Sequence, residues 1–580
     1  MHDLTMYDLI SDQPLDARTR AIQEQSEASD PRVSAFVEAS AGSGKTKLLT
    51  DRILRLMLGR AAPGQIQCLT FTKAAAAEMA LRLQHRLGEW VTLDDTALDA
   101  RLKALEVDPS DDARSTARAL FAQVLDLPGG MRIGTIHAFC QGLLRRFPLE
   151  AALPPHFRLV DEVDAGAELQ AAREGALGGA DPAAIAKVAA LLRAEDFAAR
   201  VGDLQAARTR LAPFLALGAV AREAAIRHAA SAPTQNDAAI VQAATTWPGE
   251  PVLAHALRIM AAEGSDAVRR RASEMLAWLS MPPPARAEQW DDWVGQFFSG
   301  ADFRLFGAFP NKKLAAKNPD LLPALTEEQE RLFFIEDSRR ALCCAEGTAA
   351  MLALAAPALD AYAATKDRAG LLDYTDLIGR TERLLQDPGA AWVLYKLDGG
   401  IDHLLLDEVQ DTAPQQWRIA HTLTEEFFAG LGARDTGRTF FAVGDPKQSI
   451  YSFQGADPEE FIRSRGAMAT RVSDAGLIWR DVALDVSFRS TVPVLALVDA
   501  VFRDVTAADG VTVPGTLQHH ADRAGAAGSV ELWPLAPAPP TEEGAATRWD
   551  VPSRNLGLVS APQRVADGIA DAIAALRGVK

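Results

Sequence analysis

Apolar, β-prone runs of five to seven residues recur along the chain, and each ends beside a glycine or a polar residue. They occupy 33–37, 66–72, 131–136, 401–406 and 438–443. The first run is followed by apolar residues at helical spacing, namely Leu48, Leu49, Ile53, Leu54, Met57 and Leu58. Short buried strands that alternate with helices are typical of an α/β domain with a parallel sheet.

Residues 160–370 have another pattern. Alanine and leucine recur there every three or four positions, for example over 184–192, which predicts helices. Prolines at 282–284 and the segment 310–313 interrupt the pattern. Because this region contains no nucleotide-binding motif, we expect a helical domain inserted into the α/β domain.

Length and composition add limits to this picture. A chain of 580 residues is too long for one core. We find no secretory signal and no run of about 18 uncharged apolar residues, and none of the four cysteines has C-x-x-C spacing. These features predict a cytoplasmic protein without a membrane span. The net charge of −17 argues against a generally basic surface, but not against a local basic groove.

The first strand and helix flank a candidate phosphate-binding loop. Its residues are Ala39, Ser40, Ala41, Gly42, Ser43, Gly44, Lys45 and Thr46. Glycines allow successive backbone N–H groups to face one anion, and the helix start adds positive potential. Lys45 is placed for the β- and γ-phosphates of a nucleotide, and the Thr46 hydroxyl for Mg²⁺. The first glycine of the usual pattern is Ala39 here, and the alternative is an ordinary glycine-rich turn.

Two carboxylates follow the buried run 404–406. Asp407 is the expected Mg²⁺ ligand, and Glu408 is the candidate base for an attacking water. Two acids at the end of a core strand are costly unless a cation lies beside them. Once the phosphate loop is accepted, the two acids therefore indicate a cation site rather than a structural role.

Other strand ends carry weaker candidates. Thr72 and Lys73 can hold a phosphate, or simply cap a helix. His137 and Phe139 suit a single-stranded nucleic acid, although a lone histidine is more often structural.

Gln448 can sense the γ-phosphate, and Arg489 can reach it from a second domain. Tyr451 and Phe453 can present rings to bases, and Gln25 can read adenine or be solvated.

Six motifs occur together in one order, at 39–46, 69–79, 134–139, 407–411, 444–456 and 484–490. This order resembles that of superfamily 1 helicases of the UvrD/Rep/PcrA type. Residues 69–79 and 449–458 are most similar to the AddA family, helicase-nuclease subunits of bacterial double-strand-break repair. The resemblance covers about 30–500.

The resemblance implies ATP-driven 3′ to 5′ translocation on single-stranded DNA, with ATP and Mg²⁺ between two RecA-like domains. By motif match, Gln25 resembles the adenine-reading glutamine, Phe488 the aromatic that stacks on the base, and Arg489 the arginine finger. The residues that match single-strand contacts are Thr72, His137, Phe139, Tyr451 and Phe453. An AddB-like subunit is the implied partner in a heterodimer, and no membrane is implied.

We therefore expect an α/β P-loop NTPase (RecA-like) parallel-sheet domain, a large inserted α-helical domain and the beginning of a second RecA-like domain. The expected ranges are 1–84, 129–160 and 395–470 for the ATP-binding domain, 85–128 and 161–394 for the insert, and 471–580 for the second domain.

The sequence departs from the family pattern in several places. Ser487 replaces the usual amide before the aromatic-arginine pair, and Gln454 replaces an arginine. We find neither the later helicase motifs nor a nuclease domain. The chain thus resembles the N-terminal part of a larger helicase, either active by itself or an ATP- and DNA-binding fragment that needs a partner chain. A metabolic P-loop kinase is disfavoured, because it has no need of 134–139 or 444–456.

Overall fold

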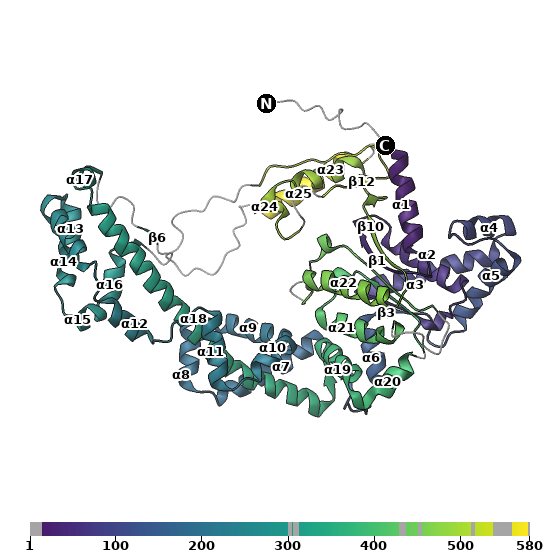
Figure 1. Cartoon of the computed structure of the whole chain (residues 1–580), viewed down its shortest axis with the longest axis horizontal. Helices are drawn as coiled ribbons and strands as arrows, with labels where there is room; N and C mark the ends of the chain where they lie inside the picture. The colour runs from purple at the N-terminus through teal and green to yellow at the C-terminus, as the bar shows by residue number, and fades with distance from the viewer. Residues whose placement is uncertain are drawn as a thin grey trace.

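A computed structural model describes residues 14–299, 304–305, 312–398, 400–428, 437–450, 455–511, 517–536 and 560–577. Figure 1 shows a sheet-containing body at one end and a helical arm that extends away from it. The predicted α/β fold with a parallel sheet is confirmed.

The central sheet has six parallel strands in the order β10-β1-β9-β8-β2-β3. In chain order these are β1 (Ser34–Ala39), β2 (Ile66–Thr70), β3 (Arg132–Thr135), β8 (His403–Asp407), β9 (Thr439–Gly444) and β10 (Trp479–Leu484). Glu38 lies opposite Gly444, and Asp407 lies opposite Val443. The carboxyl ends of the central strands are therefore level with one another.

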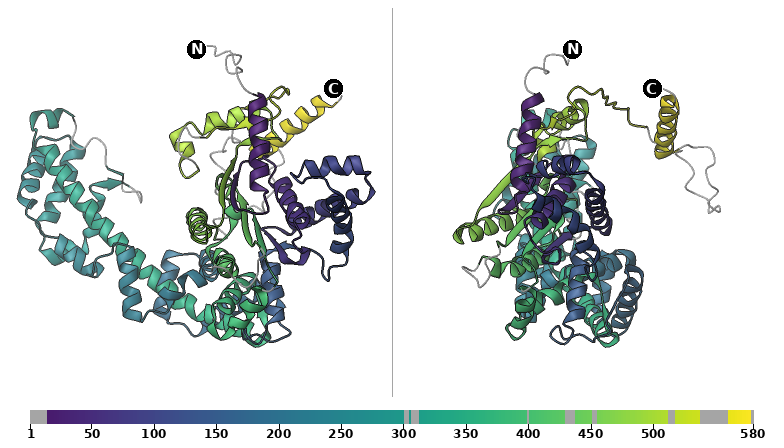
Figure 2. Two further views of the ribbon diagram at one scale, coloured as in Figure 1. Left: turned by 45° about the vertical axis from the view of Figure 1, so that its right-hand side comes forward. Right: turned by 90° about the vertical axis from the view of Figure 1, so that its right-hand side faces the viewer.

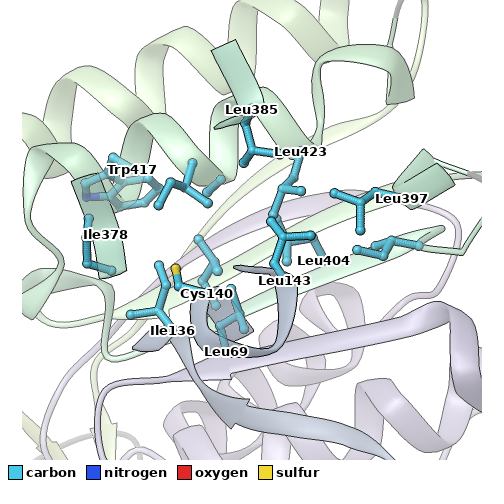
Figure 3. Packing of buried hydrophobic residues seen from close by; sticks show 14 of the residues in the cluster. Leu69, Ile136, Cys140, Leu143, Ile378, Leu385, Leu397, Leu404, Trp417 and Leu423 are labelled. Atoms are coloured by element: carbon cyan, nitrogen blue, oxygen red, sulfur yellow. The ribbon is translucent and has the colours of Figure 1, made fainter. Parts of the chain in front are cut away.

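Both faces of the sheet are covered, so its strands are apolar on both sides. Phe36, Leu404, Leu406, Phe440 and Ala442 face one core, whereas Ala35, Val37, Leu405, Phe441 and Val443 face the other. The first core lies under α6 (Ile136–Arg146), α19 (Tyr374–Gln386), α20 (Ala391–Asp398), α21 (Pro414–Leu423) and α22 (Pro458–Asp474). Figure 3 shows Leu143 of α6, Leu397 of α20 and Leu404 of β8 within this layer.

The second core lies under α2 (Lys45–Leu58), α3 (Lys73–Thr92), α4 (Asp95–Lys103) and α5 (Asp111–Leu125). This placement corrects the assignment of 85–128 to the inserted domain. Leu87, Trp90 and Leu120 pack in one cluster with strand residues such as Val37 and Leu405. Helices α19 and α20, which the insert was expected to include up to residue 394, likewise pack on the sheet.

The arm comprises α7 (Glu162–Gly178), α8 (Pro182–Leu191), α9 (Ala194–Ala206), α10 (Arg208–Leu215), α11 (Ala219–Ala229), α12 (Asp237–Ala244), α13 (Glu250–Glu263), α14 (Asp266–Leu279), α15 (Pro283–Glu288), α16 (Trp290–Gly295), α17 (Lys312–Lys317) and α18 (Leu321–Ala369). Helix α18 runs along the arm and contacts α7 to α9 and α11 to α13. Short strands pair at the base, β4 (Arg158–Leu159) with β7 (Leu371–Leu372), and near the far end, β5 (Phe298–Ser299) with β6 (Arg304–Leu305).

The far end of the arm has its own core, rich in tryptophan. Trp278, Trp290 and Trp293 pack there with Leu257 and Leu332. Within the described ranges, α18 is the one helix long and apolar enough to cross a membrane, but half of that apolar window is buried in the protein. Its packing is that of the central helix of the arm.

Strand β10 corrects the expected boundary at residue 470, because it pairs with β1 along its whole length in the first sheet. The second unit starts directly after it. There β11 (Val486–Ser487) pairs with β12 (His520–Ala521), beside α23 (Val492–Val501) and α24 (Val505–Ala508). Helix α1 (Pro14–Ala28) packs beside β10, and α25 (Ala561–Leu576) follows the second unit in the chain. Figure 2 shows α25 set apart from the sheet.

Candidate nucleotide and nucleic-acid site

Candidate segments that are dispersed in the sequence meet, where the structure describes them, at one edge of the sheet. Each candidate segment begins at or directly after the carboxyl end of a strand, at Ala39, Thr70, Thr135, Asp407, Gly444 and Leu484. In open α/β sheets, ligands bind at this edge. The parallel pairing thus joins motifs that lie hundreds of residues apart.

The phosphate loop has the backbone that its glycines predict. Gly42 and Gly44 have φ values of 78° and 90°, which side-chain-bearing residues rarely adopt. A Cβ at Gly42 would lie 2.7 Å from both the Arg489 Cβ and the Ser487 Oγ. Gly42 is therefore required by its conformation and by the close approach of the second unit.

Lys45 begins α2, and its Nζ lies 2.8 Å from Glu408 Oε2. Asp407 is the preceding residue and is almost fully buried. Burial, and then the charge of Glu408, raise the pKa of Asp407 to about 7, although Lys45 acts in the opposite direction. Lys45 therefore does not fully compensate the negative charges of Asp407 and Glu408.

Gln410, which the sequence analysis did not single out, links two motifs. Its Nε2 donates to Glu408 Oε2 at 2.7 Å, and its Oε1 accepts from the Asp445 backbone N–H at 2.9 Å. A Cβ at Gly444 would lie 2.6 Å from Gln410 Oε1. Gln410 therefore fixes the candidate base against the loop after β9. The sequence offered one sign of this role, because Gln410 lies only two residues after the candidate base Glu408.

The loop after β9 is also held by its own charges. Gln448 donates from Nε2 to Asp445 Oδ2 at 2.6 Å. Lys447 Nζ lies 2.9 Å from Asp445 Oδ1 and 3.1 Å from Glu38 Oε1. The Gln448 amide thus lies at the carboxyl edge of the sheet, and its NH₂ group is already hydrogen-bonded to Asp445.

The Gln25 side chain contacts the phosphate loop directly. Its Nε2 donates to the Ser43 carbonyl at 2.9 Å, and its Oε1 accepts from Lys47 Nζ at 3.3 Å. Phe488 donates its backbone N–H to the Gly42 carbonyl at 2.9 Å. The Arg489 side chain is exposed beside this contact. The structure therefore brings Gln25, Phe488 and Arg489 to the loop.

Two buried arginines of α2 hold α1 in place. Arg52 is fully buried and donates to the Ala28, Asp30 and Val33 carbonyls and to Thr439 Oγ1. Burial lowers its pKa to about 9. Arg55 donates to the Ser26 carbonyl and to Ser29 Oγ, both at 2.7 Å. These bonds fix the end of the helix that carries Gln25.

The polar groups at the loop fit a magnesium-bound nucleotide. Ser43 Oγ and Asp411 Oδ1 are buried without a hydrogen-bond partner, and burial raises the pKa of Asp411 to about 6, with a further contribution from Glu408. The described residues contain no cluster of three or more His, Cys, Asp or Glu side chains that could hold a metal by themselves. Mg²⁺ is commonly bound by one or two carboxylates together with phosphates, and Thr46 and Asp407 match that need.

The nucleic-acid candidates follow β2 and β3, whose ends pair at Thr70 and Thr135. Thr72 and Lys73 are exposed, and Thr72 also caps α3 by accepting from the Ala75 N–H at 3.1 Å. The capping interpretation of Thr72 is thus confirmed, and its contact with a phosphate stays a prediction.

His137 is half-buried, and burial lowers its pKa. It lies edge-on to Tyr374, with ring centroids 5.2 Å apart. Tyr374, 41% exposed, was missed because it lies far along the chain. Phe139 packs partly against the core. Tyr451 and Phe453 lie outside the described residues.

Comparisons with known proteins agree with this arrangement. The UvrD/REP helicase N-terminal domain matches residues 20–468. An ATP-dependent helicase/nuclease subunit of Lactiplantibacillus plantarum is 25% identical over 506 residues, which cover 80% of this chain and 38% of the relative. The protein of the same name from Desulforudis audaxviator is 27% identical over 520 residues, covering 81% of this chain and 38% of the relative.

The chain thus spans about two fifths of the length of these relatives. The domain match covers most of the chain and includes the strands and loops of the site, up to residue 468. This chain belongs to the UvrD/REP helicase family.

Proposed function

We propose that this chain is the N-terminal motor part of an ATP-dependent DNA helicase that moves 3′ to 5′ on single-stranded DNA in double-strand-break repair. The observation that carries the proposal is that the phosphate loop, the acids after β8 and the candidate residues after β2 and β3 share one sheet edge. Nucleotide state and nucleic-acid contact are thus linked by a few short loops. The name of the two relatives supports the assignment to helicases.

The Lys45–Glu408 contact supports a simple account of hydrolysis. The phosphates of ATP compete with Glu408 for the Lys45 ammonium, which leaves the Glu408 carboxylate free to accept a proton from the attacking water. Gln410 keeps that carboxylate in place during the exchange. Thr46 and Asp407 would hold Mg²⁺, which neutralises phosphate charge when bound.

The second unit completes the nucleotide site in this proposal. Phe488 stacks on the adenine, which Gln25 reads, and Arg489 acts on the γ-phosphate. Gln448 senses the same phosphate after exchanging its contact with Asp445. Because Phe488 is already bonded to Gly42, a change at the loop moves the second unit directly.

We assign the DNA contacts to Thr72, Lys73, His137 and Phe139, with Tyr451 and Phe453 as further stacking residues. Tyr374 joins this group because its exposed ring lies against His137. An AddB-like subunit is the proposed partner. The alternative function is an ATP- and DNA-binding part that hydrolyses ATP only together with further chain segments, since an arginine finger contributes on the order of 10³–10⁵ to turnover.

The test is ATP turnover by this chain with and without single-stranded DNA, with Glu408→Gln as the control. DNA-stimulated turnover that is lost in the control supports the motor. Nucleotide binding without turnover in either protein supports the alternative, and absence of nucleotide binding contradicts both. Displacement of streptavidin from either end of an oligonucleotide then gives the direction.

A further inference from the structure

A second cluster of exposed cationic and aromatic side chains lies at the opposite edge of the sheet. Its members are Arg132, Arg145, Arg146, Trp392, Tyr395 and Lys396, and we call it the α6–α20 patch. Arg132 begins β3, and Arg145 and Arg146 end α6. The patch therefore lies at the far end of the helix whose first turn carries His137.

Contacts join the two halves of the patch. Arg132 Nη1 donates to the Gly400 carbonyl at 2.7 Å, just after α20. The Arg146 guanidinium lies 5.2 Å from the centroid of the Phe147 ring, and that ring lies 5.2 Å from Trp392. In addition, the charge of Arg146 contributes to lowering the pKa of Arg132, second to burial. Like charges are thus held close together on one surface.

Among the side chains that the structure describes, none neutralises the cations of this patch. Among the described residues, no carboxylate forms an ion pair with Arg132, Arg145, Arg146 or Lys396. Glu150, the nearest acid along the chain after α6, does not pair with them either. In a chain with a net charge of −17, such a local excess of positive charge calls for an anionic partner.

The aromatic residues specify the kind of anion. Tyr395 is 77% exposed and Trp392 is 46% exposed, and they lie three residues apart, on one side of α20. Cations interleaved with exposed rings are typical of surfaces that bind single strands, where phosphates pair with charges and bases stack on rings. Duplex DNA would use the cations and leave the rings without a role.

We propose that the α6–α20 patch is a second binding surface for single-stranded DNA, on the path of the strand that passes His137. Residues 137 and 146 of α6 are about 13 Å apart along the helix axis, so the same strand reaches both ends. This inference rests on the proposed function, because it extends the DNA contact of the same motor.

The test measures binding of labelled oligo-dT of about 6 and about 20 nucleotides, and of a DNA duplex of about 20 base pairs, at several salt concentrations. The variants are Arg145→Gln/Arg146→Gln and Tyr395→Ala. The matched control is Arg269→Gln/Arg270→Gln, an adjacent pair of exposed arginines on the arm helix α14.

For the long oligonucleotide we expect Tyr395→Ala to weaken binding about tenfold. We expect the arginine double variant to reduce the slope of log K against log salt by about 1.4, which corresponds to two phosphate contacts on a single strand. Binding of the short oligonucleotide, ATP binding and the control variant should be unchanged.

Unchanged long-oligonucleotide binding in both variants overturns the inference, and so does a loss confined to duplex DNA, which would make the patch a duplex contact. The proposed function is judged separately. It fails if the unmodified chain binds neither oligonucleotide, whereas the inference alone fails if the unmodified chain binds and the variants match it.

Discussion

The far end of the arm and the carboxyl edge of the sheet both contain buried charges, but they balance them differently. In the arm, Arg331 makes two 2.7 Å bonds to Glu328, and Arg286 makes two 2.8 Å bonds to Glu250. The pKa of Glu328 is raised by its burial, and the bonds from Arg331 offset only part of that rise. Each acid therefore has its own cation.

At the sheet edge, Asp407, Glu408 and Asp411 share a single nearby lysine, Lys45. The pKa values of Asp407 and Asp411 rise accordingly, to about 7 and about 6. The two regions therefore differ in whether each buried acid has a cation of the protein beside it. In the arm, arginines of the protein match these acids, whereas at the edge the three acids exceed the charge of Lys45.

Breaking a balanced pair should have the largest effect. Arg331→Met leaves Glu328 buried and unpaired, so we expect the free energy of unfolding of the arm to fall by about 3–5 kcal/mol. Denaturant unfolding measures this change, and nucleotide binding should stay as in the unmodified chain. The double variant Arg331→Met/Glu328→Gln should recover part of the loss; no recovery would show that the loss comes from packing on Trp247 instead.

Removing the lysine at the edge should act on catalysis. Lys45→Met deletes the cation expected to hold the phosphates, and we expect turnover to fall roughly 10²–10³-fold. Steady-state ATP hydrolysis measures it, with Lys187→Met, a surface pair in the arm, as control. Equal effects of the two variants would contradict the comparison.

Because the acids at the sheet edge lack matching cations, we expect the stability of the chain to fall as pH rises. The pKa of Asp407 is higher in the folded chain than its ordinary value, so the folded state binds a proton that the unfolded chain releases. This stabilisation is present at low pH and is lost as pH rises through about 7. Without Mg²⁺, we expect the Asp407 contribution to stability to be about 1 kcal/mol larger at about pH 6 than at about pH 8. Asp407→Asn should remove this dependence.

The smallest expected effect is at Glu408, where one substitution should change stability and activity in opposite directions. Glu408→Gln removes a like charge beside Asp407, so we expect a gain of about 0.5–1 kcal/mol in the free energy of unfolding. Thermal unfolding measures it in the same sample that has lost turnover. A clear loss of stability would mean that the Lys45–Glu408 pair outweighs the repulsion.

Local patterns were enough to predict the phosphate loop and the acids after β8. Strand, loop and helix are contiguous there, and the positive φ at Gly42 and Gly44 follows from residue type. Gln410 and Tyr374 were not predicted, because their roles depend on which strand ends and helices become neighbours. The expected boundary at residue 470 was wrong for the same reason. β10 pairs with β1, which lies far away in the sequence, and a short apolar run does not reveal its partner strand.

The roles of the individual site residues stay predictions. Gln25 and Gln448 show why sequence alone is insufficient, since an amide can bond a ligand or the protein. Here both amides bond the protein, to Ser43 and to Asp445. Any ligand must therefore compete with an existing partner, which no motif discloses.

Helix α18 has a mechanical consequence. Its 49 residues make a rod of about 73 Å, anchored at the base by Lys366, whose Nζ lies 2.6 Å from Asp373 and 2.5 Å from Asp376. The next residue after Asp373 is Tyr374, which touches His137. A tilt of about 5° at this anchor displaces the tryptophan-rich tip by about 6 Å, from the rod length alone. An ångström-scale change beside the DNA candidates would therefore become a larger displacement at the tip of the arm, which a donor–acceptor dye pair between tip and sheet would measure.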